Sequence, residues 1–290
     1  MYKHVIKPLL FLLTPDFTHK LIVFCGRVVQ ALPPVRWAIR KSWSFQDKSL
    51  RQEVGGITFC NPIGLSAGFD KNAQLSPLME DVGFGFASGG SVTLEPRKGN
   101  RRPWFHRLPK TKSVVVYAGM PNYGLRKISR YIRRNRRRLD NMPTVVSVAV
   151  VANKTTRERM GTRLTKEAII NDVKKATEYI NDNKLASVVE INISCPNAGK
   201  EPFIETESLD VLLTTLDSVP RDVPFWVKNA AFVRCRTIRF TTPLSGVNHH
   251  EAELYSNRML HHSHNVVPSL CRSEERRVGK ECRSRWSPYH

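Results

Sequence analysis

The sequence is short of acidic residues and has no long apolar segment. Its 290 residues contain 25 Asp and Glu against 46 Lys and Arg, so the formal net charge is +21. Because no run of about 18 apolar residues occurs, the sequence predicts no transmembrane helix. A hydrophobic content of 41% excludes a wholly disordered chain. We expect a basic globular protein with enough residues for a sizeable core.

Cysteine pairs and targeting signals are also lacking. The six cysteines form no CxxC pair and are too few for a disulfide-rich secreted scaffold. No HExxH motif occurs, so no metal site is predicted. The apolar stretch near the N-terminus is not followed by a small-residue cleavage site, and we predict no signal peptide. These features predict a cytoplasmic location, with peripheral contact at the cytoplasmic membrane as a further option.

Residues 1–45 are expected to form an amphipathic helical extension. Thr14 is a suitable N-cap, followed by Pro15 at the first helical position. Beyond it, apolar residues with helical spacing stand among Lys and Arg: Phe17, Leu21, Phe24 and Val28. Such a helix suits the surface of an anionic membrane, but it equally suits packing against the rest of the domain. The pattern leaves both interpretations open.

Residues 46–228 alternate between short apolar runs and helical patterns. Strands buried on both faces are typically continuous apolar runs, and helices between them indicate a parallel sheet. This pattern predicts an α/β fold, either a (β/α) barrel or a doubly wound sheet. A complete eight-stranded barrel typically has about 250 residues, whereas we count five strands here. They are expected at residues 62–67, 84–92, 144–152, 186–193 and 224–228.

Residues 229–290 differ from the rest and are not expected to form a domain. Their hydrophobic periodicity fades, and they contain six of the nine histidines. The last residues, 272–290, match the translation of a widely used DNA-sequencing adapter. We therefore interpret 272–290 as an assembly artefact and 229–271 as frameshifted sequence, in which no function should be sought.

A dense basic cluster lies between residues 126 and 138, where eight Arg and Lys are interleaved with apolar residues at helical spacing. The preferred interpretation is a crossover helix with a solvated basic face. The functional alternatives are binding of anionic lipid or of nucleic acid. No nucleic-acid-binding motif accompanies the charge, so no nucleic-acid partner is expected.

The strongest chemical signal is the segment 190–197, at the end of the fourth expected strand. Catalytic side chains project from such strand ends in barrels. Cys195 stands there in polar company, with Asn192, Ser194 and Asn197. A cysteine beside a strand is often only a small core residue, but these polar neighbours suit a dry core poorly. The segment therefore indicates a thiol that acts as nucleophile or general base.

Four segments together resemble the dihydroorotate dehydrogenase family, which uses FMN in pyrimidine (UMP) biosynthesis. The resemblance covers roughly residues 5–228, and the segments occur in the family's order. They are Asn-Ile-Ser-Cys-Pro-Asn at 192–197, Asn-Pro-Ile-Gly-Leu-Ser-Ala-Gly-Phe-Asp-Lys-Asn at 61–72, Gly-Ser-Val-Thr at 90–93 with Gly-Asn and Arg-Pro soon after, and Gly-Met-Pro-Asn-Tyr-Gly at 119–124.

The resemblance implies an incomplete (β/α)8 TIM barrel, a flavoprotein oxidoreductase, and oxidation of dihydroorotate to orotate. Electrons would pass to a quinone or another acceptor. The implied FMN contacts are Ala67, Gly68, Lys71, Ser91, Asn192 and Lys228. The implied substrate contacts are Lys71, Gly119, Met120, Asn192 and Asn197.

Cys195 matches the family's catalytic base, which takes a proton from C5 of dihydroorotate. An unperturbed thiol has a pKa of about 8.5, so activity should rise with pH unless a neighbour favours the thiolate. The chain combines a helical extension similar to that of membrane-associated (class 2) members with the cysteine of soluble (class 1) members. Val116 and Ala149 stand where asparagines are expected to contact substrate and flavin.

The match ends after Lys228, so the family's last three strands and its phosphate site have no counterpart in the sequence. We therefore expect the chain as written to be inactive through truncation. Two alternatives stay open: a non-catalytic basic protein that binds anionic membranes or nucleic acid, and another FMN-dependent barrel oxidoreductase.

Overall fold

A computed structural model of the protein describes residues 2–193, 195 and 206–228. The predictions for Ser194, Asn197 and residues 229–290 concern positions outside the described residues. The described chain separates into two compact units, one of residues 2–19 and 101–118 and the other of 20–100 and 119–228. The boundaries expected after residues 45 and 228 stay predictions.

The first unit combines N-terminal helical turns with a β-hairpin. It contains a π-helix at Tyr2–Ile6, α1 at Lys7–Phe11 and the start of α2, and the hairpin pairs β5 (Phe105–Leu108) with β6 (Ser113–Val116). Arg107 joins the two parts, because its guanidinium donates to the Leu13 carbonyl at 2.9 Å and to Thr18 Oγ1 at 3.0 Å. Asp16 accepts a 3.0 Å hydrogen bond from the Trp104 N–H.

The second unit is built on a five-stranded parallel sheet with the order β3-β4-β7-β8-β9. The strands are β3 (Gly64–Leu65), β4 (Phe86–Val92), β7 (Thr144–Ala149), β8 (Val188–Asn192) and β9 (Phe225–Lys228). Every neighbouring pair is parallel. The expected α/β fold with a partial parallel barrel is confirmed, and all five expected strands are present, though each is shorter than its apolar run.

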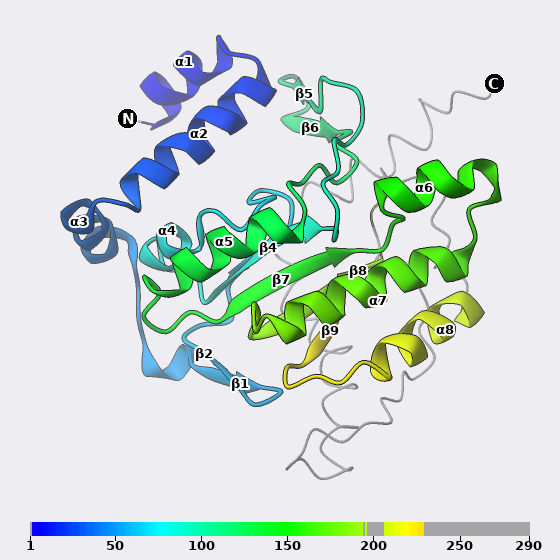
Figure 1. Ribbon diagram of the computed structural model, residues 1–290. Coiled ribbons are helices and arrows are strands. Elements are labelled where there is room, and N and C mark those ends of the chain that lie inside the picture. The colour runs from blue at the N-terminus through cyan, green and yellow to red at the C-terminus, as the bar shows by residue number, and fades with distance from the viewer. Residues whose placement is uncertain (1, 194, 196–205, 229–290) are drawn as a thin grey trace. The chain divides into compact units, whose positions relative to one another are not determined.

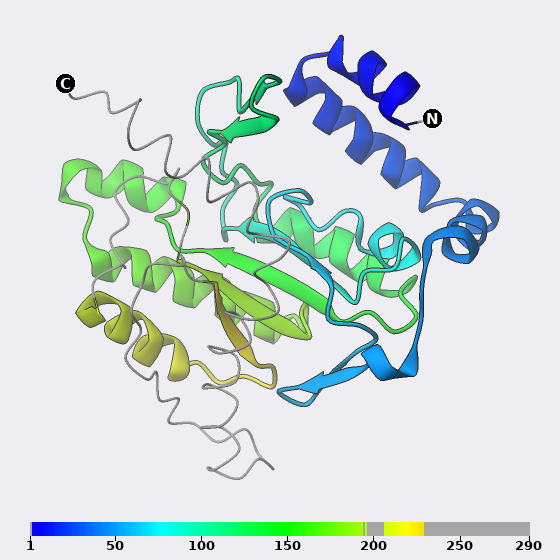
Figure 2. The same ribbon diagram turned by 180° about the vertical axis from the view of Figure 1, so that it is seen from behind.

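A helix follows each of the first four strands. These are α4 (Ser76–Asp81), α5 (Leu125–Arg136), α6 (Lys154–Met160) with a 3-10 turn at Gly161–Arg163 and α7 (Lys166–Asp182), and α8 (Thr206–Asp217). Figures 1 and 2 show α5, α7 and α8 on one face of the sheet. The apolar face of α5 is buried through Leu125, Ile128 and Ile132. The crossover-helix interpretation of the basic segment is therefore confirmed.

On the face of the sheet opposite α5, α7 and α8, the side chains change from apolar to polar toward the carboxyl ends of the strands. Side chains alternate across a strand, so Val188, Glu190 and Asn192 share one face. The register places Glu190 beside Ser147 and Trp226, and Asn192 beside Ala149 and Lys228. The polar residues thus gather toward the carboxyl ends of the strands.

The amino ends of the strands are closed by aromatic rings. A hairpin of β1 (Gln52–Val54) and β2 (Ile57–Phe59) brings Phe59 against Phe86 and Trp226, with ring centroids 5.6–5.7 Å apart. These rings pack on the buried side chains of Val145 and Val188. The aromatic cluster forms a floor beneath the polar layer.

The expected helical extension is observed as α1, α2 (Pro15–Val29) and α3 (Pro33–Trp43), followed by a 3-10 turn at Lys48–Leu50. Thr14 caps α2 as expected, because its hydroxyl accepts from the Phe17 N–H at 3.4 Å. The apolar stripe of α2 is largely exposed, with Phe24 60% and Val28 47% accessible. None of the described helices is long and apolar enough to cross a membrane.

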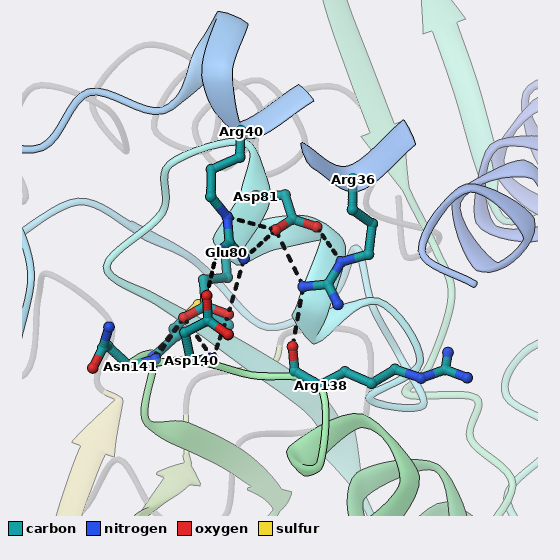
Figure 3. A network of polar contacts seen from close by, with 8 residues as sticks. Arg36, Arg40, Glu80, Asp81, Arg138, Asp140 and Asn141 are labelled. Atoms are coloured by element: carbon teal, nitrogen blue, oxygen red, sulfur yellow. Dashed lines mark hydrogen bonds and ion pairs between the residues drawn. The ribbon is translucent and has the colours of Figure 1, made fainter. Parts of the chain in front are cut away.

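Helix α3 is attached by charge rather than by apolar burial, since none of its residues is buried. Figure 3 shows Arg36 and Arg40 converging on Asp81, the last residue of α4. Asp81 is completely buried and accepts bonds of 2.5 and 3.1 Å from Arg36 and of 3.0 and 2.5 Å from Arg40. Arg40 also pairs with Asp140, and Arg36 donates to the Arg138 carbonyl at 3.0 Å.

Candidate functional site

The loop after β3 and the end of β4 are tied together by backbone hydrogen bonds. The Gly68 N–H donates to the Gly90 carbonyl, and the Gly90 N–H donates to the Asp70 carbonyl, both at 2.9 Å. Gly68 has φ of +123°, and no atom of the described residues lies within 4 Å of the position where a Cβ would stand. This backbone lies at the carboxyl ends of the strands. The absence of a side chain therefore permits a close approach to the Gly68 backbone from that side.

The Asp70 carboxylate fixes this loop from beneath. It accepts from the N–H groups of Gln74 at 2.8 Å and Leu75 at 2.7 Å, at the start of α4. Burial raises the pKa of Asp70, and the backbone hydrogen bonds oppose that rise. Asp70 thereby holds its neighbour Lys71, whose ammonium donates to the Gly68 carbonyl.

A buried chain of side-chain hydrogen bonds crosses three strands beside the loop. Asn192 on β8 donates from Nδ2 to Ser91 Oγ at 2.7 Å, and Ser91 Oγ lies 2.9 Å from Ser147 Oγ on β7. Because Ser91 accepts from the amide, its own hydroxyl proton is available for Ser147. The chain of hydrogen bonds fixes the orientation of the Asn192 amide at the end of β8.

Two further groups stand next to Asn192. Lys228 on β9 is its register partner, and Ile193 donates to the Lys228 carbonyl at 3.2 Å. Cys195 follows three residues after Asn192 and is half-buried. The strand ends β8 and β9 therefore bring an amide, an ammonium and a thiol to one edge of the sheet.

Arg97 adds a second positive charge near the thiol. Its Nε donates to the Gly119 carbonyl at 2.9 Å, which holds the guanidinium in place. Burial lowers the pKa of Arg97, as does the charge of Arg157, while interaction with Cys195 raises it. Arginine stays protonated in spite of such shifts, and a positive charge near a thiol favours the thiolate.

Gly119 and Met120 belong to a tight turn that precedes α5. Met120 has φ of +57°, and its carbonyl accepts from Asn122 Nδ2 at 3.1 Å. The Asn122 amide also accepts from the Gly124 N–H at 2.9 Å and donates to Thr93 Oγ1 at 3.0 Å. The turn is therefore locked to the end of β4.

The structure brings most of the expected site residues to the carboxyl ends of the strands: Ala67, Gly68, Lys71, Ser91, Asn192, Cys195 and Lys228. Ala149 is buried on β7 beside Asn192, so the position lacks the amide that was expected there. Val116 is exposed on β6, in the other unit. The expected contact at Asn197 lies outside the described residues and stays a prediction.

Sequence reasoning missed Ser147 and Arg97, and it assigned no role to the buried Glu190, although this residue opens the segment 190–197. Glu190 accepts from Ser88 Oγ at 3.2 Å through Oε2, while its buried Oε1 has no hydrogen-bond partner among the described residues. Ser147 and Glu190 are polar residues inside apolar strand runs, which is a signal for inward-facing polar groups. Arg97 lies in a loop and carried no such signal.

A cavity of about 360 Å³ lies away from these residues. Thr144 and Ser187, at the amino ends of β7 and β8, line it together with Arg136 and Met142. The described residues contain no group of three or more His, Cys, Asp and Glu suited to a metal ion. The chemistry-bearing groups thus gather at the opposite end of the sheet from this cavity.

Comparison with known families identifies this arrangement. The family model for dihydroorotate dehydrogenase matches residues 49–242, which is more than half of the chain. The chain belongs to the dihydroorotate dehydrogenase family. A quinone-type dihydroorotate dehydrogenase of Corynebacterium diphtheriae is 31% identical over 222 residues, which cover 76% of this chain and 57% of that protein. One of Mycobacterium tuberculosis is 30% identical over 213 residues, with 73% and 56% covered.

Solved structures show the same relationship to dihydroorotate dehydrogenases. The DHODH of Eimeria tenella in complex with ferulenol is 25% identical, with a TM-score of 0.54 over 70% of this chain and 50% of that one. Its ligand-free form has a TM-score of 0.56 at 22% identity, which shows the shared fold. The chain therefore spans about half the length of the dihydroorotate dehydrogenases it resembles.

The residues present fit FMN, the cofactor implied by the family. The open Gly68 backbone leaves room for a flat ring, and Lys71 and Lys228 provide positive charge suited to a reduced flavin. Ser91 and Asn192 offer hydroxyl and amide groups to the polar edge of such a ring. All of these residues lie on the described strands or their loops, which form about half of the family's barrel.

Proposed function

We propose that this site is part of an enzyme that oxidises dihydroorotate to orotate when its barrel is complete, with Cys195 as the general base, and that the chain as written is inactive. The observation that carries the proposal is the placement of Lys71, Ser91, Asn192 and Lys228 at one edge of the sheet, with the thiol three residues beyond the Asn192 amide. When bound, FMN supplies the acceptor for the hydride that leaves C6 of dihydroorotate.

The chain's own residues handle the proton and the orientation of the substrate. The Cys195 thiolate takes the proton from C5, and the C5=C6 double bond forms as the hydride leaves C6. The Arg97 charge favours the thiolate before the transfer. The proposed substrate amides lie against Gly119, Met120, Asn192 and Asn197, where amide groups both donate and accept.

We propose a quinone as the electron acceptor, because the curated relatives are named as quinone-type enzymes. The exposed apolar side chains of residues 20–45 suit contact with the membrane in which a quinone dissolves. They include Phe24, Trp37 and Trp43, which are 60–71% accessible. Residues 1–45 are thus proposed as a peripheral membrane contact.

We also propose that the 290-residue chain alone does not retain FMN. Its described sheet has five strands, whereas a closed barrel of this type has eight. The visible spectrum of the purified chain tests this directly. A stoichiometric flavin band would overturn this part of the proposal and leave the assignment of Cys195 untouched.

The reaction is tested in a chimera that joins residues 1–228 to the remaining C-terminal segment of the Corynebacterium diphtheriae relative. Dihydroorotate should bleach its flavin band under anaerobic conditions. Cys195→Ala should abolish most of this bleaching, whereas Cys195→Ser should retain part of it at high pH. Unchanged bleaching in both variants would refute the assignment of the base.

The acceptor is tested in the same chimera without residues 1–45. Deletion should slow quinone reduction much more than flavin bleaching by dihydroorotate. Equal losses would refute the proposed role of the extension. Retention of the cofactor, the identity of the base and the identity of the acceptor can therefore each be refuted without affecting the other two.

A further inference from the structure

We propose that the solvent-facing side of α5 binds the headgroups of anionic lipids. A stripe of arginines is formed by Arg126 and Arg130 of the helix and by Arg137 at its C-cap, and all three side chains are exposed. Their spacing of four and seven residues places them on one side of the helix. The inference rests on the membrane contact proposed above and adds a second, electrostatic component to it.

The positive charge on this stripe is not neutralised by the protein. Helix α5 contains no Asp or Glu. Among the described residues, none of the ion pairs involves α5, and these three arginine side chains make no hydrogen bond. Arg133 and Arg136, in contrast, bond to Asn183 Oδ1 at 2.7 Å and to the Lys184 carbonyl at 2.5 Å. Arg133 and Arg136 thus tie the helix to the turn after α7, whereas Arg126, Arg130 and Arg137 face solvent.

A neighbouring side of α5, and not the stripe itself, contacts the exposed apolar helices. Arg27 of α2 and Arg134 of α5 lie over the ring of Tyr131, 5.8 and 5.7 Å from its centroid. Just beyond the C-terminal end of α5, Arg36 of α3 donates to the Arg138 carbonyl. Both contacts lie within the second unit, and Figure 1 shows α3, α4 and α5 as neighbours. The basic helix is therefore fixed beside α2 and α3.

This combination favours a lipid surface over nucleic acid. Exposed tryptophans at membrane depth prefer the interface between headgroups and acyl chains, and Trp37 and Trp43 are 65% and 71% accessible. Arginines beside such an apolar helix meet the anionic headgroups at the same level. A nucleic-acid surface needs charge but gains nothing from a neighbouring apolar stripe. Charge complementarity together with the apolar neighbour points to an anionic bilayer.

The test measures sedimentation of the full 290-residue chain with vesicles. One set is phosphatidylcholine, and the other contains about one quarter phosphatidylglycerol. The variant Arg126→Gln/Arg130→Gln/Arg137→Gln is compared with Arg159→Gln/Arg163→Gln/Lys175→Gln, which removes the same charge from exposed positions on other elements. Each Arg near an anionic surface contributes about fivefold in affinity, so the α5 variant should bind anionic vesicles about 100-fold more weakly. The control variant should lose less than about threefold.

The outcomes separate the α5 proposal from the membrane contact of residues 1–45. Equal weakening by both triple variants, or wild-type binding that does not depend on phosphatidylglycerol, overturns the role of α5. Trp37→Ser/Trp43→Ser should weaken binding to both vesicle types, and failure there overturns the apolar contact only. Stronger α5-dependent binding to duplex DNA than to anionic vesicles overturns the lipid assignment. If the triple variant misfolds by circular dichroism, Arg130→Gln replaces it: binding to anionic vesicles should weaken about fivefold, and unchanged binding overturns the role of α5.

Discussion

Replacing Asp81 with asparagine is expected to release α3 before the rest of the protein unfolds. Asp81 is the shared acceptor for Arg36 and Arg40, and α3 has no buried residue that would hold it otherwise. Asparagine keeps the size of the side chain but removes the charge. Two guanidinium groups then face a neutral amide, which can accept through one oxygen only.

The magnitude follows from burial. Removing one partner of a buried ion pair costs about 3–5 kcal/mol. Asp81 is fully buried, but the side chains of Arg36 and Arg40 are 15% and 34% exposed, so solvent screens part of the interaction. We therefore expect a loss of about 2–4 kcal/mol for the docking of α3. Because about 1.4 kcal/mol corresponds to a tenfold change, the population of undocked α3 should increase by a factor between about 30 and several hundred.

Limited trypsin digestion measures this population, because α3 contains Arg36, Arg40 and Lys41. When opening is fast relative to cleavage, the cleavage rate tracks the open fraction. Asp140→Asn is the matched control, since Asp140 pairs with the same Arg40 but its side chain is 55% exposed. It should change the rate less than about fivefold. An Asp81→Asn rate within about threefold of wild type would refute this account.

Three further predictions concern the site. Burial raises the pKa of Asp70 in the folded protein, so the stability that its protonated form contributes is complete below about pH 3.9 and is lost as pH rises through the folded-state pKa. In urea unfolding, wild type should therefore lose stability relative to Asp70→Asn as pH rises. A wild type that gains stability relative to Asp70→Asn with rising pH would contradict this. Gly90→Ala places a Cβ 2.5 Å from a carbonyl oxygen of β7 at a positive φ and should cost about 2–3 kcal/mol, against about 1 for Gly56→Ala, which has open space; equal unfolding midpoints would refute the clash. In the chimera, Arg97→Gln should shift the pH midpoint of flavin bleaching upward and Arg97→Lys should restore it, because the positive charge favours the thiolate of Cys195; identical profiles would remove Arg97 from the site.

Local patterns predicted the strands because parallel strands buried on both faces leave continuous apolar runs. The same logic placed Asn192 and Cys195 at a strand end, where the structure finds Asn192 with its neighbour Lys228. The confirmed crossover role of α5 also follows from its periodicity, which separates Leu125 and Ile128 from the arginines.

Contacts between distant segments were not predictable in this way. Asp81 lies 45 residues from Arg36, and no spacing rule connects a helix end to a side chain that far away. The hairpin of β5 and β6 contains only four residues in each strand and was missed for want of a long pattern. Ser147 became part of the site only when the register placed β7 beside β4.

The aromatic cluster of Phe59, Phe86 and Trp226 closes one end of the proposed site to small molecules. Small molecules cannot pass between rings that pack on Val145 and Val188 at that end. If the proposed reaction takes place in a completed barrel, substrate and product would both use the carboxyl ends of the strands beside Asn192, because the described amino ends are filled by these rings. Orotate that accumulates should then slow the entry of dihydroorotate.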